Sequence, residues 1–361
     1  MGLNRLTRYV FREVLFAWLG VTVVLVVVLL TNRLVRFMAD AASGDIPVDM
    51  IFTLLGLKAA ANLGVVLPGS FFLGGVMALG RLYRDSEVTA MAGCGIGPGR
   101  LYAGIFALAV PLAVLVAALS LSLGPGAERE ADRVLANAQQ QARFGGVQPG
   151  RFLALGGDAT VYVESVDSDG TLQGVFAERR VDGAYQVWVA PRARREIDAV
   201  APGEFLVLED GWRYEGRAGS AAWRLMDYAE HGVRIAEPDP VEPGVGRDAQ
   251  PLATLLATDD VRALAELQRR LSFPVMVFVL ALGSLPLART DPRSGRYGRV
   301  VTAVLLFMIY FNLLFTASDW MVTGGLPQWP GLGWIHGLAL LIVLVAMRRQ
   351  LGWRWRTGRS R

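Results

Sequence analysis

Long hydrophobic runs set the pattern of apolar and polar positions along this chain. A bilayer core about 30 Å thick requires roughly 20 apolar residues per helix, and six runs meet this requirement. We therefore expect six membrane-spanning helices. The runs cover residues of about 12–32, 50–80, 101–123, 272–288, 299–317 and 333–347.

The first run is similar to the core of a secretory signal, but its length and its flanks differ from one. The string VLFAWLGVTVVLVVVLLTNRLVR continues directly into Arg33 and Arg36, without a convincing cleavage site. We interpret this run as a helix that is retained in the protein.

The arginine positions predict the topology of the helices. Short cytoplasmic segments of membrane proteins are enriched in Lys and Arg. The loop DWMVTGGLPQWPGLGW, between the last two runs, contains no arginine, whereas the segments on the opposite side contain many. We therefore expect both termini in the cytoplasm and residues 124–270 outside it. The arginines assigned to the cytoplasm are Arg5, Arg8, Arg12, Arg81, Arg84, Arg100, Arg289, Arg293, Arg296, Arg299 and those of RRQLGWRWRTGRSR.

Between the third and fourth runs, a polar helical stretch leads to short alternating segments such as TVYVESV, LQGVFAERR, YQVWVAPRARRE, EFLVLEDG and WRYEG. This spacing predicts an antiparallel sandwich, jelly roll or open barrel. Thr258, Asp259 and Asp260 then provide a cap and first-turn acids for a helix that returns to the membrane. The expected fold class is membrane α-helical, with three helices on each side of an inserted antiparallel β domain that is jelly-roll-like. The expected domains are residues 1–123, 124–257 and 258–361, the last with a basic cytoplasmic tail.

The composition agrees with a membrane class and excludes several kinds of chemistry. Hydrophobic residues make up 53% of the 361 positions. Lys58 is the only lysine, and no G-x-x-x-x-G-K-[ST] phosphate loop is present. Cys94 stands alone, and His231 and His336 are poor material for a zinc site. We expect no catalytic residues, no metal, no cofactor and no nucleic-acid partner.

The stretch LGRLYRDSEVTAMAGCGIGPGRLYAGIF places a short charged helix between the second and third runs. Asp85 and Glu87 favour a helix start because acidic groups interact well with the positive end of a helix. The glycines that follow end the helix, which we expect at about residues 85–92 on the cytoplasmic membrane surface.

Tyr83, Glu87 and Met91 recur at four-residue spacing, so we expect them to share one face of this helix. Two interpretations remain open. The helix is either an interfacial connector, in which Glu87 complements the helix dipole or pairs with Arg84, or a lever that fits a groove in a soluble partner.

Four strings resemble those of the LptF/LptG (YjgP/YjgQ) permeases of the lipopolysaccharide exporter, and the F-type subunit more than the G-type. The resemblance covers the whole chain and is strongest over residues 1–100 and 258–300. In the β domain only the strand–turn pattern matches. The strings are RYVFREVL, LVRFMADAASGDIP, LPGSFFLGGVMALGRLYRDSEVTAMAGCG and PLARTDPRSGR.

This resemblance implies a permease subunit of an ABC transporter, in the inner membrane of a Gram-negative bacterium. It implies a G-type homologue and a dimer of a cytoplasmic ABC ATPase as partners, with Tyr83, Glu87 and Met91 at the ATPase contact. Lipopolysaccharide would be extracted from the inner membrane and received by the periplasmic β domain. Periplasmic bridge proteins would then carry it toward the outer membrane.

An anionic amphiphile as cargo fits three cations. Arg33 and Arg36 lie at the outer end of the first run and share a helix face, and Lys58 lies inside the second run, where an unpaired cation is costly. Lipid A phosphates would give all three a partner. The alternative is that the arginines bind the headgroups of ordinary membrane lipids and that Lys58 extends to the interface.

Two other classes of function remain. A membrane-anchored periplasmic scaffold or receptor would use the β domain for binding and the helices only as an anchor. An intramembrane or periplasmic enzyme is less well supported, because no catalytic constellation is evident in the sequence.

Overall fold

The computed structural model describes residues 5–43, 46–145, 150, 152–154, 159–167, 171–181, 183–197, 204–220, 222–234, 246–258, 260–289 and 298–351. The chain divides into two compact units. The helical unit comprises residues 1–39, 49–134 and 245–361, and the β unit comprises residues 40–48 and 135–244.

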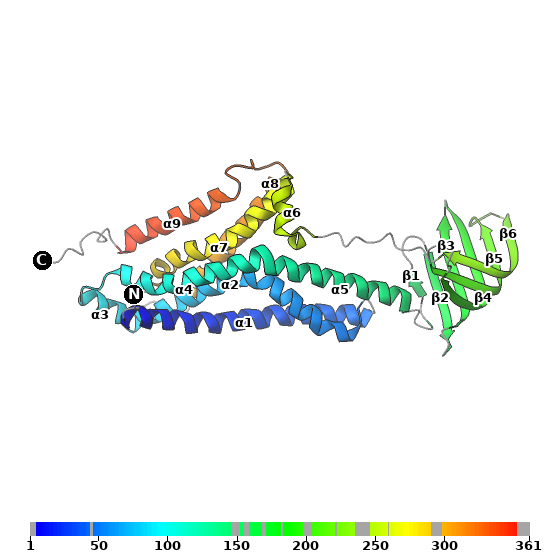
Figure 1. Cartoon of the computed structure of the whole chain (residues 1–361), viewed down its shortest axis with the longest axis horizontal. Helices are drawn as coiled ribbons and strands as arrows, with labels where there is room; N and C mark the ends of the chain where they lie inside the picture. Colours follow the sequence, from blue (N-terminus) through cyan, green and yellow to red (C-terminus); the bar gives the residue numbers. More distant parts are fainter. Residues whose placement is uncertain are drawn as a thin grey trace. The chain divides into compact units, whose positions relative to one another are not determined.

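The helices of the chain have very different lengths, and most of their residues belong to the helical unit (Figure 1). Their order begins with α1 (Arg5–Ser43), η1 (Val48–Met50), α2 (Ile51–Arg84), α3 (Glu87–Gly93), α4 (Pro98–Ala118), the π-helical turn η2 (Leu119–Leu123) and α5 (Gly124–Gly145). After the β unit follow η3 (Arg247–Ala249), α6 (Leu252–Ala257), α7 (Val261–Ala288), α8 (Gly298–Val322) and α9 (Gly333–Leu351).

Within the described residues, five helical segments are long and apolar enough to cross a membrane. They contain α1, α2, α4 with its continuation, α7 and α8. The sixth hydrophobic run forms α9, an apolar helix of 19 residues. These helices and the inserted antiparallel sheet confirm the predicted fold class.

Small residues allow α1 to pack closely against its neighbours. A Cβ atom added at Gly74 of α2 would lie 2.6 Å from Trp18 Cα, and one at Gly104 of α4 would lie 2.8 Å from Val10 Cβ. Only glycine fits at such distances. The half of α1 that begins at Arg5 is therefore held against α2 and α4, and its buried stripe includes Val10, Val14 and Trp18.

Of two local sequence signals, one marks the start of a helix and the other does not mark an end. Asp260 caps α7, because its side chain accepts a hydrogen bond from the backbone N–H of Arg262 at 3.1 Å. The Gly124–Pro125–Gly126 sequence, in contrast, does not end the preceding helix. The π-turn η2 accommodates an extra residue there and joins α4 to α5 without a break.

The β unit contains one antiparallel sheet whose strands are hydrogen-bonded in chain order, β1 to β6. This order is an up-and-down meander, and it differs from the double Greek key of a jelly roll in the strict sense. Its apolar core includes Val163, Trp188 and Leu208. The strands are β1 (Phe152–Ala154), β2 (Ala159–Val166), β3 (Leu172–Val181), β4 (Ala184–Ile197), β5 (Glu204–Gly216) and β6 (Trp223–Arg234).

One strand is longer than the sequence suggested. The segments EFLVLEDG and WRYEG, expected to be separate, form the single strand β5. Asp210 adopts a left-handed φ of 51° within it, yet pairing with both neighbouring strands continues on either side. A local distortion of the strand therefore takes the place of a turn.

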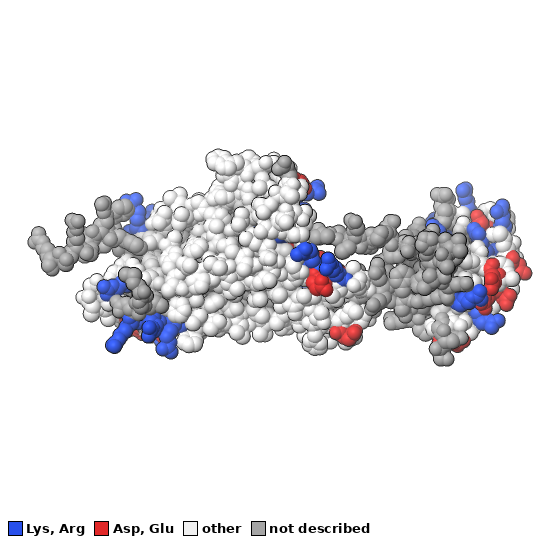
Figure 2. All heavy atoms as spheres, viewed as in Figure 1, with Lys and Arg blue, Asp and Glu red and all other residues white. Residues whose placement is uncertain are grey.

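Charged side chains are unevenly distributed over the helical unit. Figure 2 shows Lys and Arg gathered at the end that carries the N-terminus and α3, next to a broad surface with almost no charge. The arginines at that end belong to the start of α1, the end of α2 and the start of α4. The charge-free surface has the character of a lipid-facing belt.

Candidate functional sites at the two ends of the helical unit

The connector between α2 and α4 is built differently from the sequence prediction. The expected helix at residues 85–92 begins at Glu87 instead, and Tyr83 belongs to the last turn of α2. The break is at Ser86, which adopts a left-handed φ of 59°. The expectation that Tyr83, Glu87 and Met91 share one face of a single helix is therefore wrong.

These three side chains also point toward their own chain. Tyr83 and Met91 are half-buried and pack against the apolar core of the helical unit. The Glu87 carboxylate accepts a hydrogen bond from the Tyr9 hydroxyl of α1, with a distance of 2.7 Å from Tyr9 Oη to Glu87 Oε2. Nearby, Arg81 of α2 forms an ion pair of 2.6 Å with Glu13 of α1. The connector is thus tied to α1 by the hydrogen bond of Tyr9 to Glu87, and the end of α2 is tied to α1 by the ion pair.

At the other end of the unit, Lys58 is an internally paired cation. Its Nζ atom lies 2.6 Å from Glu128 Oε1 and 3.1 Å from Asp132 Oδ1, both on α5. From the sequence we expected an unpaired Lys58, because its partners are 70 and 74 residues away along the chain. The pairing removes the need for it to extend to the interface or to face a cavity.

Arg33 and Arg36 lie on the later part of α1, where Arg33 is half-buried and Arg36 is exposed. Neither guanidinium has an acidic partner among the residues that the structure describes. These arginines share a helix face as expected, since they are three residues apart on α1. The two arginines are available to bind an anion, whereas Lys58 is already paired with two carboxylates.

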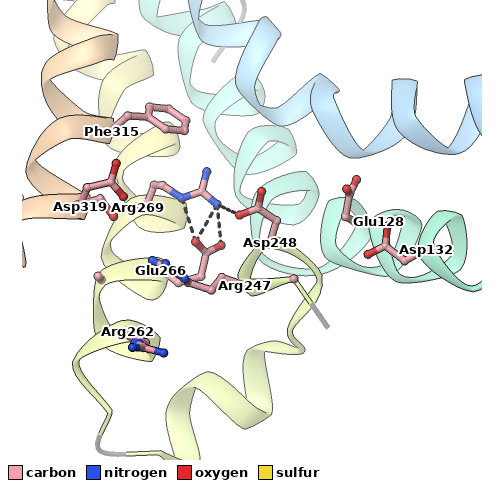
Figure 3. Close-up of a pocket in the computed structure, with 12 residues that line it drawn as sticks. Glu128, Asp132, Arg247, Asp248, Arg262, Glu266, Arg269, Phe315 and Asp319 are labelled. Carbon is pink, nitrogen blue, oxygen red and sulfur yellow. Dashed lines mark hydrogen bonds and ion pairs between the residues drawn. The ribbon is translucent and has the colours of Figure 1, made fainter. Parts of the chain in front are cut away.

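A pocket of about 380 Å³ lies near the Lys58 partners (Figure 3). Its walls come from α5, α7, α8 and the residues around η3, and most of the large side chains are charged. Arg269 also lies over the ring of Phe315, with 5.2 Å from its Cζ atom to the ring centroid. The lining residues are Glu128, Asp132, Gly246, Arg247, Asp248, Arg262, Ala265, Glu266, Arg269, Phe315, Ser318 and Asp319.

A buried ion network forms one wall of this pocket. Glu266 accepts hydrogen bonds from Arg269 and from Arg270, with 2.7 Å from Arg270 Nε to Glu266 Oε1. Arg269 also binds Asp248 at 2.6 Å, and Figure 3 shows its guanidinium between the two acids. Arg270 donates to three backbone carbonyls, those of Arg247, Asp248 and Gln250. The network fixes the η3 segment to α7.

Sequence reasoning missed this network, although a signal was present. The string AELQRR places Glu266 three and four residues before Arg269 and Arg270, which is the spacing of helical ion pairs. The bonds from Arg270 to η3 carbonyls span more than 20 residues and have no sequence signature. Among the described residues, no group of His, Cys, Asp or Glu could hold a metal ion.

A second polar chain joins α7, α8 and α9. His336 Nδ1 lies 2.5 Å from the Tyr310 hydroxyl, and His336 Nε2 lies 2.9 Å from Ser272 Oγ. Ser272 donates its own proton to the carbonyl of Gln268 at 2.8 Å. The Ser272 hydroxyl therefore accepts a hydrogen bond from His336 and is not activated as a nucleophile. The chain is a structural contact between helices.

The β unit contains an aromatic cluster around His231. The imidazole is stacked on Trp188 with 6.3 Å between ring centroids. Arg213 also lies over the Trp188 ring, with 5.4 Å from its Cζ atom to the ring centroid. Burial and then the positive charge of Arg213 lower the pKa of His231 below its usual value. Burial also raises the pKa of Tyr228 to about 12. Both groups are therefore neutral at pH 7.

The membrane-spanning helices, the inserted sheet and the short connector helix define a helical membrane protein that carries an inserted β domain. Comparison with known proteins supports this class. The chain belongs to the LptF/LptG family of lipopolysaccharide export system permeases, whose family model matches residues 8–349.

The curated relatives agree with the F-type resemblance. The chain is 32% identical over 306 residues to the lipopolysaccharide export system permease protein LptF of Escherichia coli strain K12, covering 84% of each chain. The same values apply to LptF of Escherichia coli O157:H7 and of Shigella flexneri. Family membership thus rests on most of the chain.

Proposed function

We propose that this chain is a permease subunit of an ABC transporter that extracts lipopolysaccharide from the inner membrane. It would act with a G-type homologous subunit and with a dimer of a cytoplasmic ATPase that supplies the energy. The β domain would lie in the periplasm and pass the lipid to periplasmic bridge proteins, and both termini would lie in the cytoplasm. The relatives carry the name of the export system, and the chain has no phosphate loop of its own.

The position of α3 is the observation that carries this proposal. A two-turn helix between two spanning segments lies at the arginine-rich end of the helical unit (Figures 1 and 2). The positive-inside rule assigns this end to the cytoplasm. A soluble ATPase would therefore reach α3, and the half-exposed Glu87 carboxylate on its first turn is the group that a cationic side chain of the ATPase would bind.

The cargo contacts follow from the charges at the other end. Arg33 and Arg36 would bind the phosphates of the lipid, since their guanidinium groups match phosphate geometry and have no acidic partner among the described residues. Lys58 would not contact the lipid phosphates, because Glu128 and Asp132 already neutralise it. In the β domain, the apolar cluster of the sheet, which is buried in this structure, would be the place for acyl chains.

Two measurements test this proposal. Purification in detergent from the native host should recover the G-type subunit and the ATPase together with this chain. Recovery of this chain alone would favour the membrane-anchored scaffold. The variant Arg33→Glu with Arg36→Glu should lose most photo-cross-linking to lipopolysaccharide while ATPase recovery stays at the parent level. Unchanged cross-linking would refute the cargo assignment.

A further inference from the structure

Tyr9 and Glu87 form the only hydrogen bond between α1 and α3 that the described residues show. The two side chains are 78 residues apart in sequence, and the distance between Oη and Oε2 is 2.7 Å. The acceptor is the first residue of α3. This bond therefore connects the start of the first spanning helix directly to the connector helix.

The Tyr9 hydroxyl is held in place by the packing of α1. Its ring packs against the apolar core, and the next residue, Val10, meets Gly104 of α4 at close range. Farther along α1, Trp18 donates through Nε1 to Ser70 Oγ at 3.1 Å. Helix α1 therefore cannot rotate or slide near Tyr9 without breaking close contacts, and the hydroxyl has a fixed position in the helical unit.

Glu87, in contrast, lies on an element that cannot fix it alone. Helix α3 has seven residues, and a helix of this length is not stable by itself in water. Ser86 gives no side-chain cap, and the neighbouring ion pair of Arg81 with Glu13 does not include Glu87. Tyr9 provides the side-chain contact that sets the direction of the Glu87 carboxylate. One oxygen, Oε2, is occupied, and Oε1 is left for a second donor.

We propose that Tyr9 is a positioning residue that holds the Glu87 carboxylate in the orientation required for docking of the cytoplasmic ATPase. This inference rests on the proposed function, because it needs Glu87 to be a docking contact. Preorganisation of a polar contact increases affinity by removing the cost of ordering it on binding. A second consequence is mechanical: a displacement of α3 by the ATPase is passed to α1 through the bond.

The test compares four forms of this chain: the parent, Tyr9→Phe, Glu87→Ala and the double variant. Each is purified with its G-type partner in lipid nanodiscs and titrated with the ATPase of the same host. Tyr9→Phe should weaken docking about 5- to 10-fold, which corresponds to about 1 to 1.4 kcal/mol for one hydrogen bond. The maximal ATPase rate at saturation should stay near that of the parent, because docking is impaired and the chemistry is not.

A matched control separates positioning from general stability. Tyr310→Phe also removes a tyrosine hydroxyl bond, the one to His336, but it lies on α8 and does not touch α3. It should lower the temperature of thermal unfolding without weakening docking. Tyr9→Phe should weaken docking with little change in that temperature.

Each outcome of this test either supports or overturns the positioning role of Tyr9. In the Glu87→Ala background, Tyr9→Phe should have no further effect, because the hydroxyl acts through the carboxylate. An equal effect in both backgrounds would overturn the inference, as would parent-like docking of Tyr9→Phe. If Glu87→Ala weakens docking and Tyr9→Phe does not, only the role of Tyr9 is lost. If Glu87→Ala itself docks like the parent, both the docking assignment and the inference are refuted.

Discussion

Replacing Lys58 by methionine distinguishes a structural cation from a cargo-binding one. Methionine keeps most of the side-chain volume and removes the charge. In the folded protein, Glu128 and Asp132 would then face each other without the ammonium group that bridges them. We expect the variant to unfold at a lower temperature than the parent, and we expect the loss to come from repulsion and desolvation of the two acids.

The size of the effect follows from the burial of the three groups. The exposed fraction of the Lys58 side chain is 12%, and those of its partners are 23% and 30%. Breaking a fully buried ion pair costs about 3–5 kcal/mol, whereas an exposed pair contributes at most about 1 kcal/mol. The acids keep part of their surface in water, so we expect Lys58→Met to destabilise the protein by about 2 kcal/mol.

A charge-neutral triple variant provides the decisive comparison. Combining Lys58→Met with Glu128→Gln and Asp132→Asn removes the unpaired acids, so at least half of the lost stability should return. Thermal unfolding in nanodiscs measures this recovery, and lipopolysaccharide export in the same host is measured in parallel. The reasoning is refuted if Lys58→Met unfolds like the parent, or if export is lost equally in the single and triple variants although stability has returned.

Three further predictions concern other parts of the chain. Gly74→Ala should loosen α1, because its Cβ would lie 2.6 Å from Trp18 Cα, and it should increase cleavage of α1 by added protease; parent-like cleavage would contradict this packing. Arg270→Met should cost about 3–5 kcal/mol in thermal unfolding, since it leaves Glu266 and three carbonyls short of a donor. The lowered pKa of His231 means that folding favours its neutral form, so its stabilising effect should be complete above pH 6.5 and lost as the pH falls through the folded-state value. The protection of β5 and β6 amides against hydrogen exchange, corrected for the intrinsic effect of pH on the exchange rate, should decrease over that range in the parent, and a His231→Phe variant, which lacks the imidazole, is the control.

Features set by local composition were predictable from the sequence. The hydrophobic runs located the spanning helices, and the alternating segments located the antiparallel strands, because both patterns reflect which faces are buried. The cap at Asp260 was also recognised, since a cap involves neighbours in the chain. Family strings then extended this picture from fold to function.

The details of the sites were not predictable for a physical reason. The break at Ser86 depends on a left-handed residue that is not glycine, so the spacing of Tyr83 and Glu87 suggested one helix where there are two. The partners of Lys58 and of Glu87 lie 70 or more residues away. Long-range polar pairs depend on how helices pack, and a single sequence carries no direct record of that packing.

The polar chain of Tyr310, His336 and Ser272 bears on how the last helix finds its place. Between apolar helices in lipid, no hydrophobic force selects one rotational setting over another. A copy of α9 turned away from α7 and α8 would bring an imidazole and a phenol without partners into hydrocarbon. These polar contacts therefore favour the one rotational setting of α9 about its own axis in which the three side chains are all hydrogen-bonded.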